Sequence, residues 1–119
     1  ELGRVFANLF ENARRYGRDR DTGIAEVHVS YVRSGPWVIV SVRDHGPGVP
    51  PEQQGLIFEK FRQGGDAANR PQGTGLGLPI SRQIVEHFGG RMWLDASPGP
   101  GACFGFELPL SLALQEAMP

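Results

Sequence analysis

The stretch Gln72-Gly73-Thr74-Gly75-Leu76-Gly77-Leu78-Pro79-Ile80 sets three alternating glycines directly before an apolar segment that is expected to be helical. Glycine lacks a Cβ, so the backbone of such a run can approach a ligand closely. The first turn of a helix presents unpaired N–H groups and a partial positive charge. The stretch therefore predicts an anion site, with phosphate as the usual guest. A flexible glycine hinge before a helix is the simpler alternative.

Three other motifs precede this stretch. They are Asn8-Leu9-Phe10-Glu11-Asn12-Ala13-Arg14-Arg15-Tyr16, Asp44-His45-Gly46-Pro47-Gly48 and Ile57-Phe58-Glu59-Lys60-Phe61-Arg62. In this order the four motifs resemble the N, G1, F and G2 boxes of the histidine-kinase catalytic domain. That domain belongs to a superfamily shared with gyrase, a mismatch-repair protein and a heat-shock chaperone. The resemblance covers residues 1–110, nearly the whole chain.

Composition limits the classes of protein that fit. A chain of 119 residues is long enough for one domain with a real core. Its net charge of −1 gives no reason to expect a nucleic acid or an anionic membrane as partner. No apolar run approaches the roughly 20 residues that span a bilayer, and the N-terminus lacks a signal-peptide pattern. A single cysteine, Cys103, excludes an internal disulfide and a multi-cysteine zinc site, and we interpret it as a buried structural thiol.

The hydrophobic pattern predicts two long helices. The first begins at the start of the chain, and its apolar face follows the i, i+3, i+4 rule. That face consists of Leu2, Val5, Phe6, Leu9, Phe10 and Ala13. The second spans 76–88 and ends at a pair of glycines. A short helix is expected at 50–52, and the segment 63–72 is expected to be a mobile lid because it has little to bury.

Four strands are expected, at 26–32, 37–43, 92–96 and 102–108. The first alternates with Val27, Val29 and Tyr31 on one face, which predicts a half-buried strand. In the second strand, Val38, Val40 and Val42 share one face. Asp44 follows two positions after Val42, so its side chain falls on the same face as these valines. Its carboxylate is therefore expected on the buried, helix-covered side of the sheet.

These elements predict an α+β two-layer sandwich, with helices on one face of a mixed, mostly antiparallel sheet. The resemblance names this architecture as the Bergerat ATP-binding fold. We expect a catalytic domain over 1–110 and a C-terminal tail over 111–119. The family has a short strand before its first helix, so we also expect a strand N-terminal to residue 1. The GxGxG spacing does not match the dinucleotide fingerprint, and no P-loop motif is present.

The motifs predict how a nucleotide is selected. An ionised Asp only accepts hydrogen bonds, so Asp44 favours the exocyclic amino group of adenine and disfavours the carbonyl of guanine. The resemblance implies ATP and Mg²⁺ as cofactors. It assigns nucleotide contacts to Asn8, Asn12, Arg15, Tyr16, Asp44, Gly46, Gly48, Phe58, Gly73, Thr74, Gly75, Leu76, Gly77 and Leu78.

Metal and phosphate contacts are expected from the first helix. Asn12 offers an amide oxygen, a suitable ligand for Mg²⁺ when phosphates and waters complete the shell. The resemblance makes Asn12, Arg15 and Arg62 the catalytic residues, with the two arginines near the phosphates. The hydrolysing relatives in the superfamily carry a Glu one turn before the magnesium Asn. Here that position is Asn8, whose amide cannot take a proton from water.

The γ-phosphate is therefore expected to pass to another nucleophile. In the family this is a histidine on a separate dimeric helical hairpin. We interpret His28, His45 and His87 as structural or exposed, so the acceptor lies outside this chain. The resemblance implies the catalytic domain of a sensor histidine kinase in a two-component system. It would be cytoplasmic, its parent possibly membrane-anchored, and it would bind ATP or ADP and act upstream of a response regulator.

Three alternatives remain at this stage. An anti-sigma-factor kinase of the same superfamily would phosphorylate a serine on its partner. A degenerate module would bind nucleotide, or nothing, and serve only in protein interactions, although an intact Asn12 and Asp44 argue against it. A gyrase-like ATPase is disfavoured by Asn8 and by the short chain.

Overall fold

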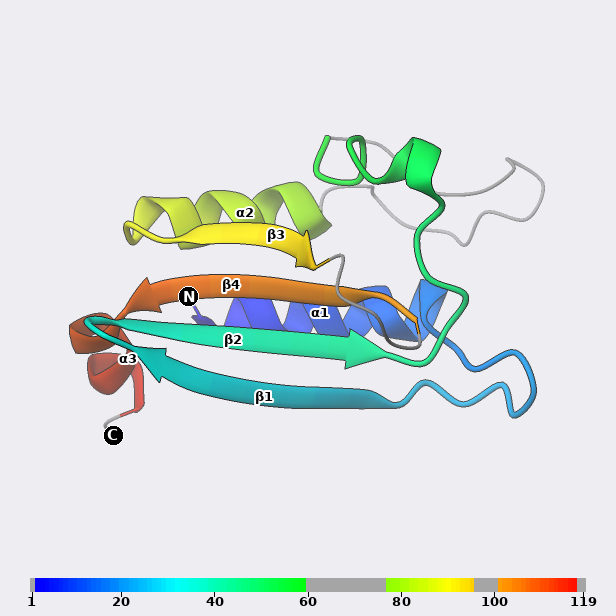
Figure 1. Ribbon diagram of the computed structural model, residues 1–119, viewed down its shortest axis with the longest axis horizontal. Helices are drawn as coiled ribbons and strands as arrows, with labels where there is room; N and C mark the ends of the chain where they lie inside the picture. The colour runs from blue at the N-terminus through cyan, green and yellow to red at the C-terminus, as the bar shows by residue number, and fades with distance from the viewer. Residues whose placement is uncertain (1, 60–76, 96–100, 118–119) are drawn as a thin grey trace.

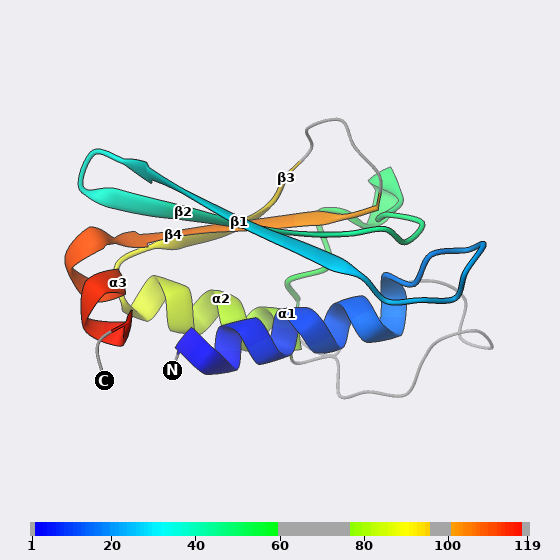
Figure 2. The same cartoon turned by 90° about the horizontal axis from the view of Figure 1, so that it is seen from below.

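A computed structural model describes residues 2–59, 77–95 and 101–117 of the chain. Its elements form two layers, a four-stranded sheet and two long helices packed against one face of it (Figures 1 and 2). The elements are α1 (Leu2–Tyr16), β1 (Val27–Ser34), β2 (Trp37–Asp44), η1 (Pro51–Gln53), α2 (Gly77–His87), β3 (Arg91–Asp95), β4 (Cys103–Pro109) and α3 (Leu110–Ala117). The expected two-layer α+β sandwich is confirmed.

The sheet has the strand order β1-β2-β4-β3, and each described pair of neighbours is antiparallel. The hairpin of β1 and β2 turns at a glycine, Gly35, which has a φ of 59°. Gly89, at a φ of 88°, follows α2 and turns the chain into β3. Glycine adopts these left-handed conformations at little cost, which explains its place at both turns.

The core lies between the sheet and the helices. From α1, Val5 and Leu9 point inward, and Phe106 of β4 is fully buried against them. Phe6 meets Phe106 edge-on, with ring centroids 5.6 Å apart. Burying a side chain of this size contributes about 1.5–3 kcal/mol to stability. From α2, Val85 completes the contact, so the two helices are held side by side under the sheet.

Strand β1 differs from the sequence-based expectation. Val27 is half-buried, but Val29 and Tyr31 are 46 % and 76 % exposed, so the prediction of a half-buried strand is wrong beyond its first residue. The reason is its position at the edge of the sheet, beyond the area that α1 and α2 cover (Figure 1). Phe10, assigned to the apolar face of α1, is also 42 % exposed and packs on Phe6 at the margin of the core.

Most of the C-terminal segment forms a helix, α3. Helix α3 follows directly after β4, and the N–H of Leu110 donates to the carbonyl of Pro36 at 2.7 Å. Leu112 packs against the core, so this helix closes the end of the sheet at the β1–β2 turn. The apolar residues at 110, 112, 113 and 114 were the available sequence signal.

Candidate functional site

Asp44 is the buried charged residue around which the site is built. It ends β2 with the parity of Val40 and Val42, and it is only 6 % exposed. The backbone N–H groups of Gly46 and Ala102 donate to its Oδ1, at 3.0 and 2.9 Å. Two hydrogen bonds to one oxygen offset the cost of burying the carboxylate and fix its orientation. The inward placement predicted from strand parity is confirmed.

Gly17 makes room for this carboxylate. It follows α1, with its N–H donating to the carbonyl of Ala13 at 2.8 Å. A Cβ on Gly17 would lie 2.6 Å from both Cγ and Oδ2 of Asp44, a separation that real side chains do not reach. The second carboxylate oxygen therefore lies against bare backbone at the C-terminal end of α1. Sequence analysis missed Gly17, although a glycine just after a helix is a recognisable signal for a chain turn.

The loop after β2 is also shaped by close backbone approaches. A Cβ on Gly46 would lie 2.5 Å from the Cα of Gly17, so these two backbones touch. Gly48 adopts a φ of 81°, as a glycine readily does. Gly101 also has a positive φ, 68°. A Cβ on Gly101 would lie 2.3 Å from Oδ1 of Asp44. Gly101 and Ala102 were not predicted as site residues, because they lie far from Asp44 in sequence.

The polar edge of α1 lies against the beginning of α2. The side-chain amide of Asn8 donates to the carbonyl of Gly77 at 3.2 Å and to Oγ of Ser81 at 3.0 Å. Asn12 follows one turn later and is half-buried. The structure thus brings two predicted site residues, Asn8 and Gly77, into direct contact. Ser81, which is fully buried, was missed by sequence analysis.

Gly77 is the first residue of α2 and does not require the special backbone that sequence analysis allowed for it. It is absent from the described glycines with positive φ, and among the described residues a Cβ there would meet only the Cβ of Asn8, at 3.9 Å. Leu78 packs against the core. Any role of Gly77 toward a ligand therefore depends on its position at a helix N-terminus, beside Asn8.

Arg15, predicted to lie near the phosphates, makes an ion pair within α1. Its Nε donates to Oε1 of Glu11 at 2.9 Å, and Arg14 also binds this carboxylate. The hydrogen bond from Arg14 and the smaller contribution of Arg15 lower the pKa of Glu11 from 4.5 to about 2. Tyr16 is half-buried at the end of the same helix. Glu11 therefore remains ionised and holds both arginines, rather than acting as a base.

Phe58 contacts both the sheet and α2. Its ring meets Phe104 edge-on, with centroids 6.4 Å apart and planes at 90°. The guanidinium of Arg82, on α2, lies 5.1 Å from the Phe58 centroid on a face of the ring. Phe58 therefore packs as a core residue between the sheet and α2. These contacts do not test the predicted nucleotide contact.

Several predicted residues lie outside the described part of the chain. They are Arg62, Gly73, Thr74, Gly75 and Leu76. The predicted lid over 63–72 also lies there. Their assigned roles stay predictions.

The described site residues flank α1, with a buried carboxylate at its C-terminal end and the N-terminus of α2 beside Asn8. Asp44 lies beside Gly17 at one end of α1, while Asn8 touches the first residue of α2. A carboxylate accepts hydrogen bonds, amides can bind a hard cation, and the α2 N-terminus favours anions. This order of groups suits a ligand with an amino-bearing base at one end and phosphates at the other.

Known proteins resemble this chain in sequence over nearly its whole length. Residues 1–112 match the family described as "Histidine kinase-, DNA gyrase B-, and HSP90-like ATPase". The adaptive-response sensory kinase SasA of Prochlorococcus marinus is 40 % identical over 109 residues, covering 92 % of this chain and 28 % of that protein. The sensor histidine kinase AruS of Pseudomonas aeruginosa is 39 % identical over 120 residues, covering 99 % of this chain and 12 % of AruS.

Solved structures show the same fold. The mycobacterial sensor histidine kinase MprB superposes with a TM-score of 0.73 at 31 % identity, over 91 % of this chain and 69 % of that one. Full-length ShkA, in complex with AMPPNP, gives a TM-score of 0.71 at 31 % identity, over 91 % of this chain and 21 % of ShkA.

The fold is that of a histidine-kinase-type ATP-binding catalytic domain. The chain belongs to the histidine kinase-, DNA gyrase B- and HSP90-like ATPase family, as the sequence motifs predicted. It spans 28 % and 12 % of the two curated relatives, SasA and AruS. Within the described residues, no helix is both long and apolar enough to cross a membrane.

Proposed function

We propose that this domain binds ATP and supplies its γ-phosphate to a histidine on a separate, dimeric helical hairpin of a sensor histidine kinase. The observation that carries the proposal is Asp44, a carboxylate 6 % exposed whose Oδ1 is held by two backbone N–H groups. Such a fixed acceptor matches the amino group of adenine and opposes the carbonyl of guanine. ShkA, which shares the fold, was solved in complex with the ATP analogue AMPPNP.

The phosphates are proposed to lie at the N-terminus of α2. Gly77 begins this helix, and its carbonyl is held by Asn8 from the neighbouring helix. The exposed N–H groups of the first turn and the helix dipole favour negative charge there. Asn8 thus positions the helix end against α1. We assign Gly73 to Leu76 to the same phosphate cradle on the basis of the family motif.

Mg²⁺ is the proposed metal cofactor, and the donor set on α1 fits it. Asn12 is half-buried one turn after Asn8, on the helix edge that meets α2. Its amide oxygen is a hard, neutral ligand of the type that Mg²⁺ accepts alongside phosphate oxygens and waters. When bound, the ion would neutralise phosphate charge. Arg62 and Arg15 are the proposed cationic partners of the phosphates, and Arg15 would have to exchange Glu11 for a phosphate oxygen.

Water is not the proposed acceptor of the phosphoryl group. A catalytic base must be able to take a proton, and Asn8 offers only an amide whose nitrogen already donates to Gly77 and Ser81. Glu11, the nearest carboxylate along α1, is bound by two arginines. Transfer to a histidine, and from there to a response regulator, is the function that this arrangement supports. ATP is the donor, so we assign the domain to the cytoplasm.

Phosphotransfer in trans is the decisive experiment. The chain would be mixed with Mg²⁺, ATP carrying a labelled γ-phosphate, and a separately produced hairpin domain bearing the acceptor histidine. We expect acid-labile phosphate on the hairpin, very slow release of free phosphate, and no label on the chain itself. Rapid ATP hydrolysis by the chain alone, or label on one of its own residues, would contradict the proposal. Failure to bind an ATP analogue would reduce the domain to an interaction module.

A further inference from the structure

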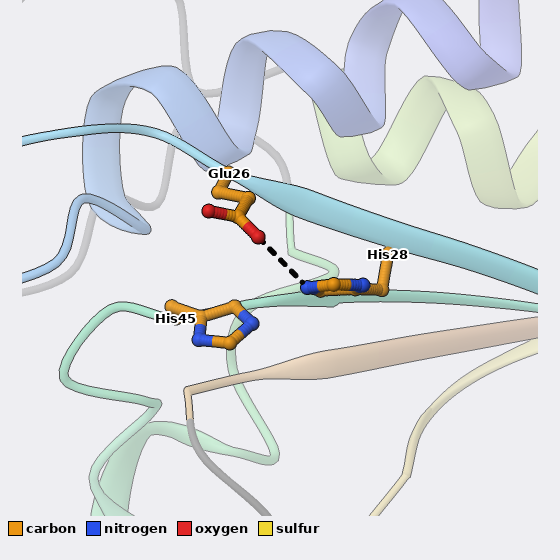
Figure 3. Close-up of side chains that lie close together, drawn as sticks. All are labelled: Glu26, His28 and His45. Carbon is orange, nitrogen blue, oxygen red and sulfur yellow. Dashed lines mark ion pairs between the residues drawn. The ribbon is translucent and has the colours of Figure 1, made fainter.

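Three side chains with metal-binding atoms meet on the face of the sheet that the helices leave open. Glu26 immediately precedes β1, His28 lies within it, and His45 follows β2 (Figure 3). The register pairs Val27 with Asp44 and His28 with Arg43. Continued by one residue, this register sets Glu26 opposite His45.

Strand alternation explains why these side chains share a face. Opposed residues of an antiparallel pair project to the same side, and neighbours along a strand project to opposite sides. Val27 and Asp44 point toward the helices, where Val27 packs against the core and Asp44 is buried. Glu26, His28 and His45 therefore project to the other side. The cluster is separated from the Asp44 carboxylate by the thickness of the sheet.

The three side chains are already close. The Nε2 of His28 lies 3.1 Å from Oε1 of Glu26, and the two imidazole centroids are 4.8 Å apart with planes at 46°. One ligand atom from each residue lies within 4.8 Å of the other two. Around a tetrahedral zinc ion, ligands at about 2.0–2.2 Å are roughly 3.3–3.5 Å from one another. Glu26 and His28 are exposed and His45 is half-buried, so small side-chain rotations can bring the ligand atoms to that separation.

The charges around the cluster are mixed. Glu26 contributes a negative charge directly. Asp19 is within electrostatic reach: its pKa is lowered mainly by hydrogen bonds from the backbone of Thr22 and Asp21, and also by His45. Arg43 lies opposite His28 on the same face and opposes a cation, but it has an interaction of its own.

We propose that Glu26, His28 and His45 form a binding site for a divalent transition-metal ion of the zinc class, distinct from the Mg²⁺ site of the nucleotide. Two imidazoles and one carboxylate are a ligand set that Zn²⁺ uses, with a water in the fourth position. Mg²⁺ prefers oxygen ligands and retains its waters, so it would not compete effectively here. The ion would tie the beginning of β1 to the loop that leaves Asp44.

The test is a titration of the nucleotide-free chain with Zn²⁺ in the presence of excess Mg²⁺. Calorimetry measures the binding, and NMR monitors the histidine rings. We expect one zinc per chain, with shifts confined to the rings of His28 and His45. His28→Gln and His45→Gln should each weaken binding by about 10- to 100-fold or more, since even outer-shell partners have effects of that size. Glu26→Gln should weaken it less, because a neutral oxygen remains. Zinc should also raise the Tm of the parent chain and not that of the histidine variants.

Two variants serve as matched controls. His87→Gln removes an exposed histidine at the end of α2 and should leave zinc binding unchanged. Cys103→Ala removes a thiol that is 4 % exposed and whose pKa is raised by burial, and it should also have no effect. The proposal is overturned if the titration shows no zinc binding, if the His28 and His45 rings do not shift, or if either control abolishes binding. Loss of fold in a variant would be seen in its NMR spectrum, and the remaining two ligand variants then decide.

Discussion

Asp44 and Ala102 hold one another through two hydrogen bonds. The N–H of Asp44 donates to the carbonyl of Ala102 at 2.9 Å, and the N–H of Ala102 donates to Oδ1 of Asp44, also at 2.9 Å. The end of β2 is thereby fixed to the residue just before β4. Oδ1 therefore supports the fold, and Oδ2, which lies beside Gly17, is the oxygen that we propose accepts a hydrogen bond from adenine.

Asp44→Asn should separate these two roles. The amide oxygen of Asn can still accept from Gly46 and Ala102, so the fold should survive. Losing a charged hydrogen bond to adenine costs about 1.5–3 kcal/mol, or roughly a 10- to 150-fold loss of affinity for an ATP analogue. Calorimetry on both proteins, with GTP as a second ligand, measures this. Equal binding of ATP and GTP by the parent chain would refute the assignment of Asp44 to adenine.

Gly17→Ala should disturb the Asp44 carboxylate without adding or removing a charge. Its Cβ would lie 2.6 Å from Cγ and Oδ2 of Asp44, so backbone or carboxylate must shift. Overpacking of this kind typically costs about 1–3 kcal/mol of unfolding free energy. Gly3→Ala is the matched control, because a Cβ there has nothing within 4 Å and lies in α1. It should be neutral or stabilising, by up to about 1 kcal/mol. Urea unfolding of both variants would show whether Gly17 is special.

Asn8 and Asn12 should respond differently to replacement by Ala. Asn8→Ala removes the hydrogen bonds to Gly77 and Ser81 and leaves the buried Ser81 hydroxyl without this partner. It should lower the free energy of unfolding by about 1–2 kcal/mol. Asn12→Ala should leave stability nearly unchanged, lower affinity for ATP only when Mg²⁺ is present, and abolish phosphotransfer to a hairpin domain. Should Asn12→Ala retain both activities, the magnesium ligand has been misassigned.

Glu11 should titrate at an unusually low pH. Its pKa is lowered to about 2, first by the hydrogen bond from Arg14 and then by Arg15. Because the folded pKa is below the unfolded one, the stabilisation is present above pH 4.5 and is lost as the pH falls toward 2. The ion pair is exposed, so this contribution is small. NMR of the Glu11 carboxyl group, over the pH range in which the domain stays folded, should show a higher titration midpoint in Arg14→Gln. The control variant Arg33→Gln should leave the midpoint of Glu11 unchanged. Identical midpoints in all three proteins would contradict the ion pair.

Patterns local in sequence predicted the layers and the central residue of the site. Periods of 3.6 and 2 located the helices and strands, and the parity of β2 placed Asp44 on the buried side, where it lies at 6 % exposure. The same reasoning could not show that β1 is an edge strand, because strand order depends on contacts between distant segments. The alternation of Val27, Val29 and Tyr31 therefore suggested burial that the sheet does not provide.

The site residues that were not predicted from the sequence were missed for one reason. Gly17, Gly101 and Ala102 act on Asp44 from elements far along the chain, through space that only the folded sheet defines. Ser81 could not be predicted for the same reason. A serine in an amphipathic helix gives no functional signal by itself, and only the fold shows that Asn8 donates a hydrogen bond to it. A sequence motif points to residues expected to contact a ligand. It does not reveal the residues that make space for those side chains in the fold.

The outer edge of β1 has a consequence for handling the protein. Among the described strands, β1 has a neighbour on one side only, and Val29, Tyr31 and Val32 are exposed along it. Its free N–H and C=O groups are a template on which the β1 of a second molecule can add. Concentrated samples are therefore expected to self-associate through this strand. A lysine introduced at Val32 should extend the concentration range in which the domain stays monomeric.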